Sequence, residues 1–172
     1  SFYRYVNQAR LQHLMASRSS IRTLRGTPLA PDRIVEAIAI AQQAPSQCNR
    51  QSTRVHTYQD RARIQELLAL QGGSRGFADS VGNLFVVSSE ICAWGGPGQR
   101  NQAYVDGALF AMCLMFACRS MGWGACPLNL AIDHAPLARN HYPIRTIRAA
   151  QQQRRNRIMA TREAQLIQLE QR

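Results

Sequence analysis

The chain has 172 residues, a formal net charge of +11 and no lysine, so arginine supplies every permanent positive charge. Hydrophobic residues make up 45% and charged residues 18%, which is typical of one globular domain and excludes a largely disordered chain. Eight arginines and two glutamates fall within residues 139–172, so over half of the excess charge lies near the C-terminus.

Composition also bears on compartment and on metal binding. Residues 1–10 lack the apolar core of a secretory signal, and the longest apolar run, residues 107–118, is too short to span a bilayer. We therefore expect a cytoplasmic protein with no membrane partner. The number of cysteines is odd and their spacing matches no zinc motif, which indicates reduced thiols: Cys48, Cys92, Cys113, Cys118, Cys126. The histidines are scattered along the sequence, so no metal site is expected: His13, His56, His134, His141.

The first half of the chain predicts three helices and one strand. An amphipathic helix is expected over residues 3–16, and a second helix begins at Pro31 and ends before Pro45. Residues 44–51 form a loop, and alternating side chains predict a strand from Thr53 to about Tyr58. Asp60 is the expected N-cap of a helix through Leu70.

The second half predicts a strand, a long helix and a basic tail. A flexible loop over residues 71–80 precedes a buried strand over 83–88, and a glycine-rich loop over 93–100 is a candidate lid. The central helix covers residues 102–121, with Asp106 as a candidate cap, and ends at Gly122 and Gly124. Beyond it we expect a strand over 125–132, a short helix capped by Asp133, and a weakly patterned helix over 151–172.

This order of elements predicts a mixed α/β domain of two or three layers, built around the apolar run of residues 107–118. We expect residues 1–133 to form the domain. Residues 134–172 read as a separate segment rich in arginine and glutamine, either helical or poorly packed.

Two polar segments carry the candidate chemistry. Arg18, Ser20 and Arg22 alternate, so in an extended chain the two guanidinium groups and the hydroxyl would face one ligand, and that combination suits a phosphate. The second segment is a loop fixed by a proline, whose short polar side chains suit the donors and acceptors of a flat heterocycle: Pro45, Ser46, Asn49, Gln51.

Taken together, the segments resemble a known family. The sequence Arg-Ser-Ser-Ile-Arg, a helix opened by proline, and then Ala-Pro-Ser-x-x-Asn-x-Gln before a strand is similar to the opening of the nitroreductase family. Asp106-Gly107-Ala108 before the long helix, and Gly122-Trp123-Gly124-Ala125-Cys126 after it, resemble the family's central helix and the turn that follows. The resemblance covers residues 14 to 130.

The resemblance implies an α+β fold: a three-layer nitroreductase-like sandwich with a mixed, mainly antiparallel sheet and a long central helix through which two chains dimerise. It implies FMN (flavin mononucleotide) at the dimer interface, and hydride transfer from NAD(P)H to a small conjugated electrophile, such as a nitroaromatic or a quinone, by a ping-pong mechanism. No catalytic side chain is then required, since the flavin carries the chemistry.

The resemblance also assigns roles to residues. Arg18, Ser19 and Ser20 would hold the phosphate and ribityl end, and Arg22 would sit near the pyrimidine edge, where its charge stabilises the reduced ring. The residues that would line the ring, some of them from the partner chain, are Pro45, Ser46, Asn49 and Gln51. Trp94 and Trp123 are candidates either for a substrate pocket or for the core.

The sequence departs from the family pattern in three places. Ser19 replaces the second arginine of the opening motif, and Ser52-Thr53 replaces the usual Pro-Trp. The third departure is the tail, where Arg145 or Arg148 would have to replace the family's phosphate contact. The alternative function is therefore a catalytically degenerate member of the fold that binds nucleic acid or an acidic partner through Arg154, Arg155 and Arg157.

Overall fold

The computed structural model of the chain describes residues 7–129. Several expectations concern other residues and lie outside this range: the domain boundary at 133, the helix capped by Asp133, the segment 151–172, two of the histidines and the five arginines of the tail named above. The described residues form four α-helices, four short 3₁₀ helices and two strands, so the α+β prediction is confirmed.

The two strands form an antiparallel pair. β1 (Thr53–Tyr58) pairs with β2 (Leu84–Ser89) in a register that sets Val55 opposite Val87. The boundaries predicted for both strands agree within one residue. The prediction that β2 is buried is wrong, because all six of its residues are only half-buried. In the described part of the chain β2 is an edge strand, so one of its long sides carries no neighbouring strand.

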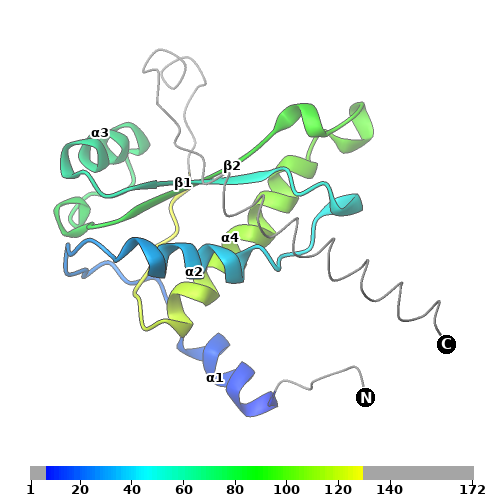
Figure 1. The fold of residues 1–172 in the computed structure, drawn as a ribbon. Helices are drawn as coiled ribbons and strands as arrows, with labels where there is room; N and C mark the ends of the chain where they lie inside the picture. Colours follow the sequence, from blue (N-terminus) through cyan, green and yellow to red (C-terminus); the bar gives the residue numbers. More distant parts are fainter. Residues whose placement is uncertain (1–6, 130–172) are drawn as a thin grey trace.

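The core lies between this sheet and two helices. Figure 1 shows α2 (Pro31–Ala41) and the long helix α4 (Gln102–Ser120) crossing beneath the two strands. Phe110 and Leu114 of α4 pack with Ile34 and Ile38 of α2 and with Val55 of β1. The apolar run over residues 107–118 thus lies in the core, and the long central helix is confirmed.

The boundaries of the helices follow local signals. α2 begins with Pro31 at its first turn, and α3 (Arg61–Gln71) begins after Asp60, whose Oδ1 accepts from the Arg63 backbone nitrogen at 2.9 Å. Gly72 ends α3 with a φ of 76°, a left-handed conformation that glycine adopts without strain. Both N-terminal predictions are therefore confirmed.

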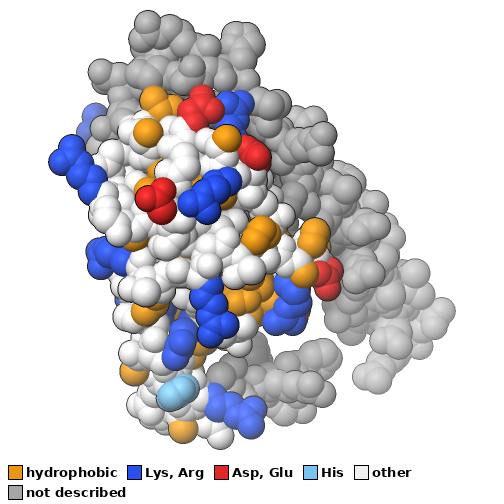
Figure 2. Space-filling model, turned by 90° about the vertical axis from the view of Figure 1, so that its left-hand side faces the viewer, with side chains coloured by type: hydrophobic (Ala, Val, Ile, Leu, Met, Phe, Trp, Pro, Cys, Tyr) orange, Lys and Arg blue, Asp and Glu red, His pale blue; other side chains and the backbone are white. Residues whose placement is uncertain are grey.

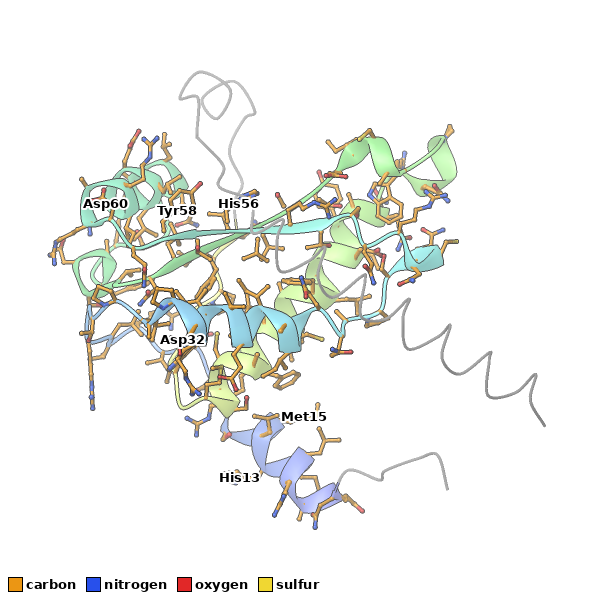
Figure 3. All side chains as sticks on the ribbon, viewed as in Figure 1. His13, Met15, Asp32, His56, Tyr58 and Asp60 are labelled. Carbon is orange, nitrogen blue, oxygen red and sulfur yellow. The ribbon has the colours of Figure 1, made fainter. Side chains whose placement is uncertain are left out.

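Helix α1 (Gln8–Ser17) differs from its prediction in two respects. In the described residues it begins after Asn7, whose side-chain oxygen accepts from the Arg10 nitrogen at 3.3 Å. None of its residues is buried, and the apolar side chains Leu11 and Met15 are 47% and 53% exposed. Figure 3 labels Met15 and His13 on this helix, at the edge of the described fold.

Two expected loops contain more structure than predicted. Residues 71–80 include the 3₁₀ helix Ala78–Ser80 and the buried Phe77. The candidate lid over 93–100 overlaps the 3₁₀ helices Ile91–Ala93 and Pro97–Gln99. The expected strand over 125–132 is present only as an isolated parallel bridge between Ala125 and Ser20; residues 126–129 form no strand and 130–132 lie outside the described range.

Candidate functional site

The segment that follows α1 is held against the C-terminal end of α4. The Ile21 nitrogen donates to the Ala125 oxygen at 3.0 Å, beside the bridge between Ser20 and Ala125. On α4 itself, Arg119 Nε donates to Ser17 Oγ at 3.0 Å. Residues about a hundred positions apart in sequence therefore lie side by side at this end of the helix.

A small pocket opens at this junction. Its volume is about 20 Å³, which is room for little more than one water molecule. The lining includes two guanidinium groups and two serine side chains but no carboxylate: Ser17, Arg18, Ser19, Ile21, Met115, Arg119, Trp123, Ala125. We call these residues the guanidinium pocket. Its charge and hydrogen-bond donors suit an oxyanion such as a phosphate.

The structure brings together some of the residues predicted for the phosphate and not others. Arg18 and Ser19 line the guanidinium pocket, whereas Ser20 and Arg22 do not. Arg22 is exposed, and its backbone oxygen accepts from Ser80 Oγ at 3.4 Å. Of the three alternating residues, only Arg18 lines this pocket. That Arg18, Ser20 and Arg22 bind one ligand together stays a prediction.

The second polar segment, residues 45–51, is held at the opposite end of α4. Ser46 Oγ donates to Asp106 Oδ2 at 2.6 Å, and the Gln47 nitrogen donates to the same oxygen at 3.1 Å. Asp106 Oδ1 accepts from Gln102 Nε2 at 2.7 Å, and the carboxylate is 2% exposed. Asp106 therefore anchors the loop, and the prediction that it caps α4 is wrong: it lies five residues inside that helix, whose N-cap is Asn101.

The backbone of this loop is strained. Cys48, Asn49 and Gln51 have φ values of 49°, 53° and 50°, in the left-handed region that side chains other than glycine rarely occupy. The Gln51 nitrogen donates to Ser46 Oγ at 2.9 Å, and Gln51 Nε2 donates to Asn49 Oδ1 at 3.0 Å. The anchor thus maintains a conformation that exposes the Asn49 and Gln51 amides, and such local strain is common at functional sites.

Arg50 connects this loop to the glycine-rich segment. Its guanidinium lies 5.4 Å from the centre of the Trp94 ring, and Nη1 donates to Gln99 Oε1 at 2.9 Å and to the Ala93 oxygen. Gln99 Oε1 also accepts from the Gly95 nitrogen at 2.8 Å. The candidate lid is therefore tied to the loop in this structure, and sequence reasoning did not identify Arg50 as the link.

The two polar segments do not meet within one chain. One is attached at Asp106 and the other at Arg119, and thirteen residues of helix separate these positions by about 20 Å. Figure 1 shows them at opposite ends of α4. Trp94 lies near the first end and Trp123 near the second, so a single chain does not combine the two tryptophans in one pocket.

Besides Arg50, two residues at the other end of α4 were missed by the sequence analysis. Arg119 and Ser17 line the guanidinium pocket, but each stands in a helix without any motif. Only the contact between the ends of α1 and α4 identifies them. Among residues 7–129, no group of three or more histidine, cysteine, aspartate or glutamate side chains lies together in a way that could hold a metal ion.

His56 is the buried histidine of the sheet. It is 5% exposed, and its Nε2 lies 2.9 Å from Ser88 Oγ on the facing strand. Burial, and then the charge of Arg54, lower the pKa of its imidazole, so the neutral form is favoured. Figure 3 labels it on β1, the strand that also carries Tyr58. His56 therefore reads as a structural residue.

Comparison with known proteins shows the family and the fold of the chain. The sequence model of the nitroreductase family matches residues 15–139. A nitroreductase-like protein from Streptococcus mutans is similar with a TM-score of 0.70 and 18% identity, over 80% of this chain and 83% of that one. The ydfN protein of Bacillus subtilis has a TM-score of 0.68 and 21% identity, over 77% and 81% of the two chains.

NfrA1 from B. megaterium is also similar, with a TM-score of 0.62 and 23% identity over 68% of this chain. The chain spans about half of its length, 53%. No curated protein matches the sequence. The family match covers well over half of the chain, and the solved structures share its fold. The chain therefore belongs to the nitroreductase family, whose members are generally flavin-dependent oxidoreductases.

Proposed function

We propose that the protein is an FMN-dependent oxidoreductase that transfers hydride from NAD(P)H to a small conjugated electrophile, such as a nitroaromatic or a quinone, by a ping-pong mechanism. Bound FMN would accept the hydride and pass it on. The observation that carries the proposal is the pair of polar segments at the two ends of α4, one rich in guanidinium groups and the other in exposed amides.

The donor set fits the phosphate end of this cofactor. Arg18 and Ser19 line a pocket without a carboxylate, and among residues 7–129 Arg18 forms no ion pair. Ser20 follows directly and is exposed, within reach of the ribityl chain. These three residues would bind the phosphate and ribityl groups, while Arg22, also exposed, would place a positive charge near the pyrimidine edge of the ring.

The loop over 45–51 would line the ring. The hydroxyl of Ser46 is already used by Asp106 and by the Gln51 nitrogen, so its contribution is to fix the loop. Asn49 and Gln51 are exposed and offer amide donors and acceptors, and Pro45 adds an exposed apolar surface. No dinucleotide fingerprint is needed if the nicotinamide stacks directly on the flavin.

A homodimer would bring the two segments together. The guanidinium pocket is too small to enclose a flavin, and the loop lies about 20 Å away in the same chain. α4 exposes an apolar stripe on the side opposite the core, in which Val105, Leu109 and Met112 are 48%, 40% and 37% exposed. If two α4 helices crossed along this stripe, the loop of one chain could reach the guanidinium pocket of the other.

The same stripe could be read as membrane-facing. By length and composition, the 24 residues Pro97–Ser120 would suit a membrane span. Their most apolar stretch of 18 residues has a mean hydropathy of 1.3, and 28% of this stretch is buried. However, its other face packs against α2 and the sheet, and it contains a buried aspartate that binds the 45–51 loop. This favours a second copy of the chain as the occupant of the stripe. The free cysteines in turn suit a cytoplasmic location.

The test is an absorbance spectrum of the purified full chain, followed by identification of the released cofactor. We expect a yellow protein that releases FMN on denaturation and oxidises NADH or NADPH in the presence of a quinone. Arg22→Ala should slow flavin reduction more than it weakens FMN binding. A colourless protein that takes up no FMN would contradict the proposal and favour the alternative of a degenerate binding module.

A further inference from the structure

We infer that Arg119, in the last turn of α4, is a second phosphate-binding residue of the proposed flavin site and sets its preference for FMN over riboflavin. The inference rests on the proposed function. It concerns a residue that belongs to no motif of the sequence and lies 101 positions from Arg18.

The side chain of Arg119 is held in place by a neighbouring hydroxyl. Its Nε donates to Ser17 Oγ at 3.0 Å, and Ser17 Oγ in turn donates to the Leu14 oxygen at 3.1 Å. Ser17 therefore uses its donor on the backbone of α1 and its lone pair on Arg119. These two hydrogen bonds hold the guanidinium group in place without neutralising its charge.

The two terminal nitrogens of Arg119 have no partner among residues 7–129. The ion pairs in that part of the chain join other arginines to Glu36, Glu66 and Glu90. Arg119 lines the same pocket as Arg18, which likewise has no carboxylate nearby. Two like charges on residues that line one small pocket repel each other, and an anion bound between them would remove this cost.

A structural role at the end of α4 explains the charge less well. A basic residue in the last turn of a helix stabilises its carbonyl end. Here those carbonyl oxygens already have donors, since Ala117 accepts from the Met121 nitrogen at 3.1 Å and Cys118 from the Trp123 nitrogen at 2.8 Å. The Nε of Arg119 is directed to Ser17 and not to these oxygens.

The experiment compares FMN with riboflavin, which has the same ring and ribityl chain but lacks the phosphate. Affinities of the full-length protein for each are measured by quenching of flavin fluorescence. Arg119→Ala should weaken FMN binding about tenfold, the effect of one charge-assisted hydrogen bond, and change riboflavin binding less than about twofold. Arg61→Ala, an exposed arginine on α3, is the control for loss of one positive charge.

Equal losses for both flavins, or none for either, would overturn the inference. If Arg119→Ala does not fold, Arg119→Lys decides: a lysine keeps the charge but not the fork held by Ser17, so FMN should bind more weakly than in the wild type while riboflavin is unaffected. A wild-type protein that binds neither flavin would contradict the proposed function itself. Binding of both flavins with equal affinity would contradict only the role of Arg119.

Discussion

The two ends of α4 differ in how they use their hydrogen-bonding groups. At Asp106 the buried carboxylate accepts from Ser46, Gln47 and Gln102, so its capacity is used within the fold. At Arg119 Nε is bonded to Ser17, the terminal nitrogens have no partner among residues 7–129, and the residue lines a pocket without a carboxylate. A site residue is therefore better identified by unused donors than by its residue type, because satisfied groups stabilise structure and unsatisfied charged groups attract ligands.

The arginines outside the guanidinium pocket are arranged differently from those that line it. On the face shown in Figure 2, arginines are dispersed among neutral side chains and form no continuous basic patch. Among residues 7–129, three arginines are paired with glutamates: Arg33 with Glu36, Arg54 with Glu90 and Arg63 with Glu66. Other exposed arginines, such as Arg22 and Arg61, also form no ion pair among residues 7–129. The guanidinium pocket is therefore distinguished by two arginines that line one pocket whose lining contains no carboxylate.

The largest effect is expected when two chains are kept apart. Leu109→Glu places a charge in the exposed apolar stripe of α4 and should convert a dimer into a monomer, with a loss of FMN affinity of roughly 30-fold or more, since the site would lose the partner's loop. Light scattering after size exclusion and fluorescence titration measure both effects. Val35→Glu is the control, because Val35 and Leu109 are equally exposed at 40%. A monomeric wild type that binds FMN would refute the two-chain site.

The next test removes the anchor. Asp106→Ala should lower the free energy of unfolding by about 3 kcal/mol, because three donors at a buried position lose their acceptor. Urea unfolding followed by circular dichroism measures it. The exposed Asp79 offers a control, and Asp79→Ala should change stability by less than about 0.5 kcal/mol. Similar losses for both variants would show that the carboxylate does not anchor the loop.

The strained backbone of the 45–51 loop can be tested by substituting glycine. Cys48→Gly should stabilise the protein by about 0.5 kcal/mol. Glycine adopts a φ of 49° without steric strain, and the relief of this strain exceeds the entropic cost of a glycine in the unfolded chain. Cys92 is also exposed but has no positive φ, so Cys92→Gly should destabilise slightly. Thermal unfolding of the two variants under reducing conditions gives the sign of each effect. The same sign for both would argue against strain at Cys48.

His56 has one bonded and one unbonded ring nitrogen, and its substitution is expected to have the smallest effect on stability. Nε2 is bonded to Ser88, while Nδ1 is buried without a partner in the described residues. Because the folded protein holds the pKa of His56 below its usual 6.5, the unfolded chain takes up a proton first as the pH falls, and stability should decrease below about pH 6.5. Melting temperatures between pH 7.5 and 5 measure this slope. His56→Gln should flatten the slope and His13→Gln should not.

Much of the local structure was predictable from sequence. The proline at the start of α2, the aspartate before α3 and the apolar spacing of α4 each act within a few residues, and the structure places all three elements accordingly. Alternation in β1 fixed that strand, while β2 was predicted at the right place with too much burial. Burial depends on what covers a strand, and a local pattern does not contain that information.

The site was predictable only in part. Motif resemblance identified Arg18 and Ser19, which line the guanidinium pocket, and it identified the loop that contains Asn49 and Gln51. It did not identify Arg119 or Arg50, and it misread Asp106 as a cap of its own helix. Each of these side chains acts on a segment at least 40 residues away, and no spacing rule applies over such separations.

Local patterns in the sequence were enough to establish the family, the four α-helices and the two strands of the described residues, and the residue types available for a phosphate and a flat ring. These follow from short-range sterics, capping and apolar periodicity, which are properties of neighbouring residues. Only the tertiary structure decided which of those residues are used internally. The packing of α1 and of the 45–51 loop against opposite ends of α4 determines which donors are satisfied and which remain for a ligand.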